Sequence, residues 1–312
     1  MQLKLAPIRA AFALLNFTSA RSSAKLAQRL YTVPSRKTKT PTSEERAFFT
    51  NATAFSIPYP SHPLRAWRLG DSDAKPVLLV HGWNGNPSAF VPLANRLLAL
   101  GFQVICYEAP GHGLHPEHFT TPMGFADSIH AALNTIGPVH AIVGHSMAAG
   151  ALVMASKRGL PTERLILLSP WTRVIDHTHL FGDYMGISRN AIALMRKLVW
   201  DYGEPSSSRY GSDWDSLYTT PQEHPTLIIH DEKDPMVPVA NAEWLKQQWP
   251  QSCFVKTKGL RHNHIMKDPD VMGQICRFLA EATPSGATIF SDGGHEASFI
   301  RQVPVPPTLR PV

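Results

Sequence analysis

The chain has 312 residues, of which 43% are hydrophobic and 17% are charged, so it can bury a large core and is not a disordered chain. The formal net charge of +6 is concentrated at one end, because the first 43 residues hold eight basic side chains and no acidic one. The remaining residues carry 22 basic against 24 acidic side chains. That balance provides no electrostatic attraction for polyanions, so we expect no binding to nucleic acid.

Three cysteines, Cys106, Cys253 and Cys276, each lie in an apolar strand or helix pattern. We interpret them as small buried hydrophobic residues in a reducing compartment rather than as a disulfide framework, and we expect a cytoplasmic protein. The sequence has no CxxC spacing typical of a metal site. It also has no apolar run close to the roughly 18 residues that span a bilayer.

Residues 1–43 are predicted to form a basic N-terminal helical arm. Leu5, Ile8, Phe12 and Leu15 recur at helical spacing, and residues 25–30 form a second short helical pattern. Three interpretations remain open: an organellar transit segment, a helix that makes peripheral contact with a membrane surface, or an arm packed on or near the rest of the protein. A secretory signal is disfavoured because the apolar stretch over residues 10–17 is short.

The region from Glu44 to Ala74 is predicted to be strand-like. Residues 54–57 and 64–69 alternate in polarity around a proline-rich turn, which indicates an antiparallel edge hairpin. Near-continuous apolar runs then occur at residues 77–80, 103–106, 139–143, 165–168 and 226–229, and a further strand is expected at 253–256. Such runs are typical of strands that are covered on both faces.

Helical patterns separate these strands. Apolar residues recur every three or four positions over residues 90–100 and 125–136, and each pattern ends at a glycine, Gly101 or Gly137. Further helices are predicted over residues 147–157, 240–249 and 271–278. This alternation predicts an α/β fold with a mostly parallel, doubly wound sheet, whose active site lies beyond the carboxyl ends of the strands.

We predict one main domain over residues 44–283. Between the sixth and seventh strands, residues 171–222 are rich in apolar residues and interrupted by loops, so we expect a small helical cap there. The alternative is an ordinary extra pair of helices. The tail over residues 284–312 is rich in proline, glycine and serine and is expected to be flexible.

Ser146 lies where the apolar run over residues 139–143 stops at Gly144 and a helical pattern begins. A sharp turn between a strand and a helix exposes a serine hydroxyl, and it needs small neighbours such as Gly144 and Ala148. The pattern resembles the G-x-S-x-G nucleophile elbow of the α/β-hydrolase superfamily, with Ala148 in place of the second glycine. The resemblance spans roughly residues 50–283.

The resemblance implies an acid and then a histidine on later strand-end loops, because a serine needs a base and an oriented imidazole to act as a nucleophile. It selects Asp234, which precedes a Val-Pro turn; Asp231 is the local alternative, and Asp176 is the candidate if the acid lies one strand earlier. The base implied by the resemblance is His262, and His264 is its alternative. Arg261 stands where the superfamily has a second glycine.

The close pairs His262/His264 and His177/His179 also suggest a metal site. No carboxylate accompanies either pair at ligand spacing, so we expect no metal and no cofactor.

The resemblance also implies an oxyanion hole. Its donors would be the amide of Met147, directly after the nucleophile, and the amide of Trp83, in the His81-Gly82-Trp83 turn. Residues 108–113 match the superfamily's D-x-P-G-H-G turn with glutamate in the aspartate position, and we interpret His112 and His145 as structural.

Together these residues predict a serine hydrolase that cleaves a small carboxylic ester or thioester through an acyl-enzyme intermediate. Within the same fold, the alternatives are a membrane-associated lysophospholipase or lipase and a C–C bond hydrolase. The alternative that is not an enzyme is a scaffold or receptor with the hydrolase fold.

Overall fold

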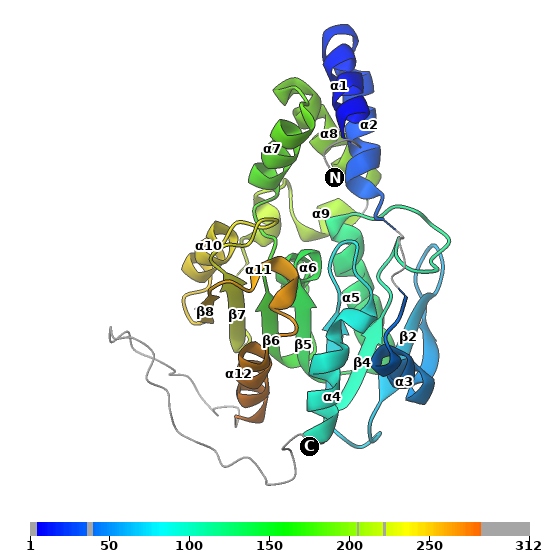
Figure 1. The fold of residues 1–312 in the computed structure, drawn as a ribbon, viewed down its shortest axis with the longest axis vertical. Coiled ribbons are helices and arrows are strands. Elements are labelled where there is room, and N and C mark those ends of the chain that lie inside the picture. The colour runs from blue at the N-terminus through cyan, green and yellow to red at the C-terminus, as the bar shows by residue number, and fades with distance from the viewer. Residues whose placement is uncertain (1–4, 36–39, 205, 221–222, 282–312) are drawn as a thin grey trace.

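A single mixed sheet organises the computed structural model, which describes residues 5–35, 40–204, 206–220 and 223–281. Its strands follow the order β1-β2-β4-β3-β5-β6-β7-β8 (Figure 1). The strands are β1 (Thr53–Ile57), β2 (Leu64–Leu69), β3 (Pro76–Val80), β4 (Gln103–Tyr107), β5 (Val139–His145), β6 (Thr162–Leu168), β7 (Thr226–Asp231) and β8 (Cys253–Thr257). β2 pairs antiparallel with both β1 and β4, and every other pairing is parallel.

Helices cover both faces of this sheet. Apolar side chains of α5 (Pro122–Ile136), α6 (Met147–Ser156) and α10 (Ala240–Gln248) pack into one core, and those of α3 (Ser43–Asn51), α4 (Val91–Ala99) and α12 (Pro269–Ala280) pack into the other. Two short 3₁₀ helices, η2 (Pro87–Phe90) and η3 (Ser216–Tyr218), and the four-residue α11 (Arg261–His264) complete the body. Because both faces are covered, β3 to β7 are apolar along most of their length.

A helical cap rises between β6 and β7, as predicted. It consists of α7 (Val174–Met185), α8 (Arg189–Tyr202) and α9 (Ser206–Tyr210). The predicted architecture, a mostly parallel doubly wound sheet with a cap between the sixth and seventh strands, is therefore confirmed.

The N-terminal residues form two helices, α1 (Ala6–Thr18) and α2 (Ala20–Thr32), that stand beside the cap helices in Figure 1. Phe12, Ala24 and Ala27 are fully buried against Ile192 and Met195 of α8. The arm and the cap therefore share an apolar core of their own, separate from the two cores of the sheet.

Two local expectations were wrong. Residues from Ser43 form helix α3 rather than strand-like structure, and the helix is started by a capping box in which Thr42 and Glu45 exchange side-chain-to-backbone hydrogen bonds. Cys253 is exposed because it lies on β8 at the edge of the sheet, and Cys276 is half-buried, so only Cys106 is a buried hydrophobic residue.

The expectations for the C-terminal tail and for parts of the basic arm concern residues that the structure does not describe. The tail over residues 284–312 and part of the basic arm, namely residues 1–4 and 36–39, lie outside the described residues. Within the described ranges, none of the helices combines the length and apolar character that crossing a membrane requires.

Candidate active site

Ser146 occupies a strained turn between β5 and α6. Its φ is 57°, a left-handed conformation that L-residues other than glycine rarely adopt. The turn is held by the Ser146 amide, which donates to the Leu168 carbonyl over 2.8 Å. Gly144 is required because a Cβ there would lie 2.7 Å from Leu152 Cδ1 and 2.9 Å from the Ala149 nitrogen. The sharp turn expected from the sequence is therefore present.

His262 joins Ser146 to Asp234. Its Nδ1 lies 2.6 Å from Asp234 Oδ2 and its Nε2 lies 3.0 Å from Ser146 Oγ. A carboxylate can only accept, so Nδ1 carries the proton and donates it; in the neutral ring Nε2 then accepts from the serine hydroxyl. The structure thus brings together three side chains that are up to 116 residues apart in the sequence.

Asp234 is held as a carboxylate. Its Oδ1 accepts from the amides of Met236 and Val237 at 2.8 and 2.9 Å, and its Oδ2 lies 3.4 Å from His230 Nε2 as well as close to His262. Burial by itself raises the pKa of Asp234. Hydrogen bonds from His230 and His262 and from the Val237 amide outweigh burial and hold this pKa well below its ordinary value.

The alternative acids and base lie elsewhere. Asp231 is buried and accepts from the amides of Lys233 and Leu260 and from the Thr257 hydroxyl, so it ties β7 and β8 to the loops that follow them. Asp176 forms an exposed ion pair with Arg173. His264 is exposed two residues beyond His262.

Arg261 has a φ of 57°, which gives a physical reason for the glycine that the superfamily prefers at this position.

A second histidine, His145, couples the turn at Ser146 to the loop that carries His262. His145 Nε2 lies 2.9 Å from the carbonyl oxygen of His262, which can only accept, so the imidazole donates. Burial first, and then the nearby His262, lower the pKa of His145 to about 3. His145 is therefore a neutral structural ring at physiological pH.

The loop after β3 lies directly against Ser146. A Cβ on Gly82 would be 2.8 Å from the His145 carbonyl oxygen and 2.9 Å from Ser146 Cβ, so only glycine allows this approach. Trp83 follows immediately. Met147 is the first residue of α6, and the amides of a first helical turn have no intrahelical acceptor. One candidate oxyanion donor, Met147, thus directly follows Ser146 in the chain, and the other, Trp83, directly follows the glycine that approaches Ser146.

The arm supports the same loop. The Ser35 amide donates to Asn84 Oδ1 over 2.5 Å, and the Asn84 amide donates to His112 Nε2 over 3.1 Å. Asn84 has a φ of 56°, a conformation that asparagine tolerates better than most residues. His112 is buried here and helps fix the loop, as expected for a structural residue.

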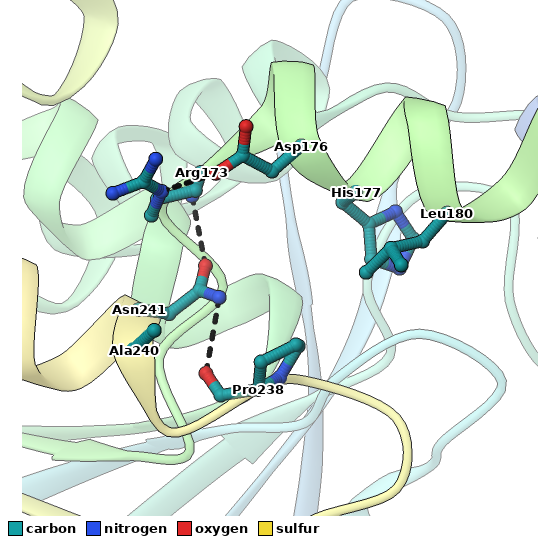
Figure 2. A pocket seen from close by; sticks show the side chains of 7 residues that line it. All are labelled: Arg173, Asp176, His177, Leu180, Pro238, Ala240 and Asn241. Atoms are coloured by element: carbon teal, nitrogen blue, oxygen red, sulfur yellow. Dashed lines mark hydrogen bonds and ion pairs between the residues drawn. The ribbon is translucent and has the colours of Figure 1, made fainter.

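A cavity of about 220 Å³ opens between the cap and the loop that carries Asp234 (Figure 2). Its walls come from the start of α7 and from the segment that leads into α10, and they comprise Arg173, Asp176, His177, Leu180, Pro238, Ala240 and Asn241. The Asn241 side chain accepts from the Arg173 amide over 2.8 Å and donates to the Pro238 carbonyl over 3.1 Å. Asn241 therefore joins the base of the cap to the loop that holds Asp234.

His177, for which the sequence suggested only a metal-binding role, belongs to the candidate site. It lines the cavity, and its Nδ1 lies 3.3 Å from the hydroxyl of Tyr31 in the arm. Burial, and then the nearby His262, lower the pKa of His177 to about 4. No sequence signal pairs Tyr31 with His177, because 146 residues separate them.

His179 contacts Arg189 and Arg196 instead of His177. Over the part of the chain that the structure describes, no group of three or more His, Cys, Asp or Glu side chains is placed to hold a metal ion.

Sequence comparison finds relatives that carry the name of a hydrolase. RutD of Escherichia coli (strain K12 / DH10B), named as a carbamate hydrolase, is 33% identical over 114 residues, which are 34% of this chain and 42% of RutD. The chain thus matches less than half the length of these curated relatives.

Structural comparison finds the same fold in proteins with low identity. An esterase of Pyrococcus furiosus has a TM-score of 0.59 at 15% identity, covering 80% of this chain and 96% of that one. A thermophilic esterase of Thermogutta terrifontis has a TM-score of 0.51 at 17% identity, covering 73% and 97%. The model of the alpha/beta hydrolase family matches residues 77–300, which include the turns around Ser146, Asp234 and His262. The chain therefore belongs to the alpha/beta hydrolase family.

Proposed function

We propose that this protein is a serine hydrolase that cleaves a carboxylic ester or thioester of modest size, with Ser146 as nucleophile, His262 as base and then acid, and Asp234 as the group that orients His262. The observation that carries the proposal is the continuous chain of short contacts, 3.0 Å from Ser146 to His262 and 2.6 Å from His262 to Asp234.

The first half of the reaction forms an acyl-enzyme. Ser146 Oγ attacks the carbonyl carbon while His262 Nε2 takes the hydroxyl proton, and the Asp234 carboxylate stabilises the imidazolium that results. The amides of Met147 and Trp83 would donate to the developing oxyanion, each contributing about 3 kcal/mol of transition-state stabilisation. The leaving alcohol or thiol then takes the proton from His262.

The second half releases the acid. Water replaces the leaving group, His262 takes its proton, and the same two amides bind the second oxyanion. The carboxylic acid then leaves as His262 returns the proton to Ser146 Oγ, which restores the hydroxyl. Neither half of the reaction needs a cofactor.

The cavity beside the loop that carries Asp234 is the proposed binding site for either the acyl or the alcohol part of the substrate. Leu180, Pro238 and Ala240 give it an apolar wall, and Arg173 and Asp176 neutralise each other at its rim. An uncharged acyl or alcohol group of modest size matches these walls better than an anion does.

A comparison of two variants across a panel of soluble substrates tests this proposal. We expect p-nitrophenyl esters and matched thioesters to be hydrolysed, with Ser146→Ala lowering kcat by about 10³-fold or more. Cys106→Ala changes a buried residue that has no proposed role in the reaction and should keep most activity. Equal turnover by Ser146→Ala and wild type would refute the nucleophile assignment, and no turnover of any substrate would favour a non-catalytic scaffold.

A second candidate substrate class is carbamates, which the similarity to RutD favours. The same attack on a carbamate carbonyl would give a carbamoyl-enzyme. Carbamates assayed beside the esters distinguish the two candidates by their kcat/KM ratios. The three free cysteines support a reducing compartment, the cytoplasm in this proposal.

A further inference from the structure

The arm and the cap end together at one protruding tip. Asn16, near the end of α1, donates from Nδ2 to the Gly186 carbonyl over 2.9 Å and accepts from the Ser188 amide over 3.1 Å. These contacts join the α1–α2 turn to the α7–α8 turn. We name this region, residues 14–21 and 184–189, the cap tip; in Figure 1 it lies at the end of the long axis opposite α4 and α12.

Large apolar side chains are exposed on the cap tip. Phe17 is 96% exposed, Leu14 is 66% exposed and Tyr184 is 54% exposed. Leu14 and Phe17 are three residues apart on α1, so they share one helix face. Single exposed apolar residues are ordinary in proteins, but an almost fully exposed phenylalanine on a protruding turn that carries two other exposed apolar side chains is less so. Among the described residues, no side chain covers Phe17 to an extent that would explain its place there.

Three basic residues lie at or near the cap tip. Arg21 is exposed just after Phe17, Arg9 lies close to Gly186, and Arg189 begins α8. Asp183, one residue before the cap tip, is ion-paired with Arg189 at 3.0 Å. The charged groups at the tip therefore leave a positive excess, on an arm that has no acidic residue in its first 43 positions.

We propose that the cap tip docks on an anionic phospholipid bilayer, with Phe17 and Leu14 inserted among the acyl chains and the arginines at the headgroups. Exposed aromatic and leucine side chains with surrounding basic residues are the combination that interfacial binding requires. The proposal does not depend on catalysis.

The cap offers a route from this surface to the cavity. Leu180 lines the cavity and is 50% exposed, and Tyr184 lies four residues further along the same helix toward the tip. Residues four apart are neighbours on a helix surface, so an exposed apolar stripe leads from the cap tip to the cavity wall. Docking in this orientation would bring the cavity close to the membrane surface.

Vesicle co-sedimentation of the full chain tests the proposal. We expect binding to vesicles that contain phosphatidylserine, weak binding to phosphatidylcholine alone, and loss of binding at high salt. The double variant Leu14→Ser/Phe17→Ser should weaken binding at least about tenfold, since each side chain loses its transfer into the bilayer. Equal binding by this variant and wild type would overturn the proposal.

Matched controls keep the result interpretable. Leu100→Ser changes a 56% exposed leucine at the end of α4, far from the tip, and should bind vesicles like wild type. Point variants are preferred to deletion of residues 1–43, which would also remove the buried Phe12 and Ala24. An unchanged circular dichroism spectrum and an unchanged thermal unfolding midpoint of the double variant would show intact folding. If sedimentation velocity instead showed a dimer that the double variant abolishes, the tip would be a contact between copies and the membrane proposal would be wrong.

Discussion

His145 Nε2 donates a hydrogen bond to the carbonyl oxygen of His262 over 2.9 Å. The residue before the proposed nucleophile thereby positions the loop that carries the proposed base. Their rings lie 4.7 Å apart, centroid to centroid, and both side chains are buried. The two loops that cooperate in the proposed reaction are therefore fixed to each other through His145, which has no chemical role in that reaction.

This contact predicts a split between two variants of His145. His145→Phe keeps the bulk of the side chain but leaves the His262 carbonyl without its hydrogen-bond donor. We expect kcat on soluble esters to fall about tenfold to a hundredfold, because a small displacement of a catalytic group lowers the rate by this order. His145→Gln can still donate and should retain most of kcat. Steady-state kinetics at pH 7 measures both; equal losses would mean that the position needs a histidine for another reason.

Asp234 and Asp231 are three residues apart but should respond differently to the same change. Asp234→Asn removes the charge that stabilises the His262 imidazolium and should lower kcat by about 10³- to 10⁴-fold. Asp231→Asn weakens the loop contacts to Leu260 and Lys233 and should chiefly lower the free energy of unfolding, by about 1–3 kcal/mol. Kinetics and urea denaturation of both variants test this. A reversed pattern would make Asp231 the catalytic acid.

Buried neutral histidines predict acid lability. Burial, and then neighbouring histidines, lower the pKa of His81 and of His145 to about 3, against about 6.5 in an unfolded chain. Below pH 6.5 the unfolded state binds more protons at these positions, so their contribution to stability is complete above that pH and decreases as the pH falls toward 3. Each ring should contribute a slope of about 1.4 kcal/mol per pH unit in that range.

Chemical denaturation between pH 7 and the acid range measures the slope. His81→Gln and His145→Gln should each reduce the slope of the unfolding free energy against pH by about 1.4 kcal/mol per pH unit, which corresponds to one proton. The double variant should reduce this slope by about twice as much. A slope that is the same in wild type and in the double variant would contradict the assignment of both rings as neutral in the folded state.

Gly150 is the helical glycine that the site requires. A Cβ there would lie 2.0 Å from the Trp171 carbonyl oxygen, and the Trp171 amide donates to the Ser146 carbonyl. Gly150→Ala should therefore destabilise the protein by about 1–3 kcal/mol through overpacking and lower kcat by displacing Ser146. Gly273→Ala in α12 is the matched control: its Cβ would meet only Arg277 Nη1, at 3.7 Å, and it should stabilise by about 0.5–1 kcal/mol. Thermal unfolding of both variants tests the two expected changes in stability, and steady-state kinetics of Gly150→Ala tests the expected fall in kcat.

Features with a local cause were predictable from the sequence. The turn at Ser146 follows from an apolar run that ends at a glycine before small residues, and the sheet follows from apolar runs separated by helical patterns. Helix α3 had an equally local signal, the Thr42-x-x-Glu45 capping box, which the strand-like expectation overlooked.

Features that depend on tertiary packing were not predictable. The contact of Tyr31 with His177 and that of Ser35 with Asn84 each join segments that have no shared pattern. The exposure of Cys253 depends on β8 lying at the edge of the sheet, which its own apolar neighbours do not reveal.

Labelling with a fluorophosphonate probe, followed by mass spectrometry of the modified peptide, tests the central claim most directly, because the probe reacts with a serine only when a base activates it. We predict a single adduct on Ser146, no adduct in Ser146→Ala, and labelling slowed by at least about 10²-fold in His262→Ala. A native chain that stays unlabelled, or one that is labelled equally well without His262, would contradict the proposed triad.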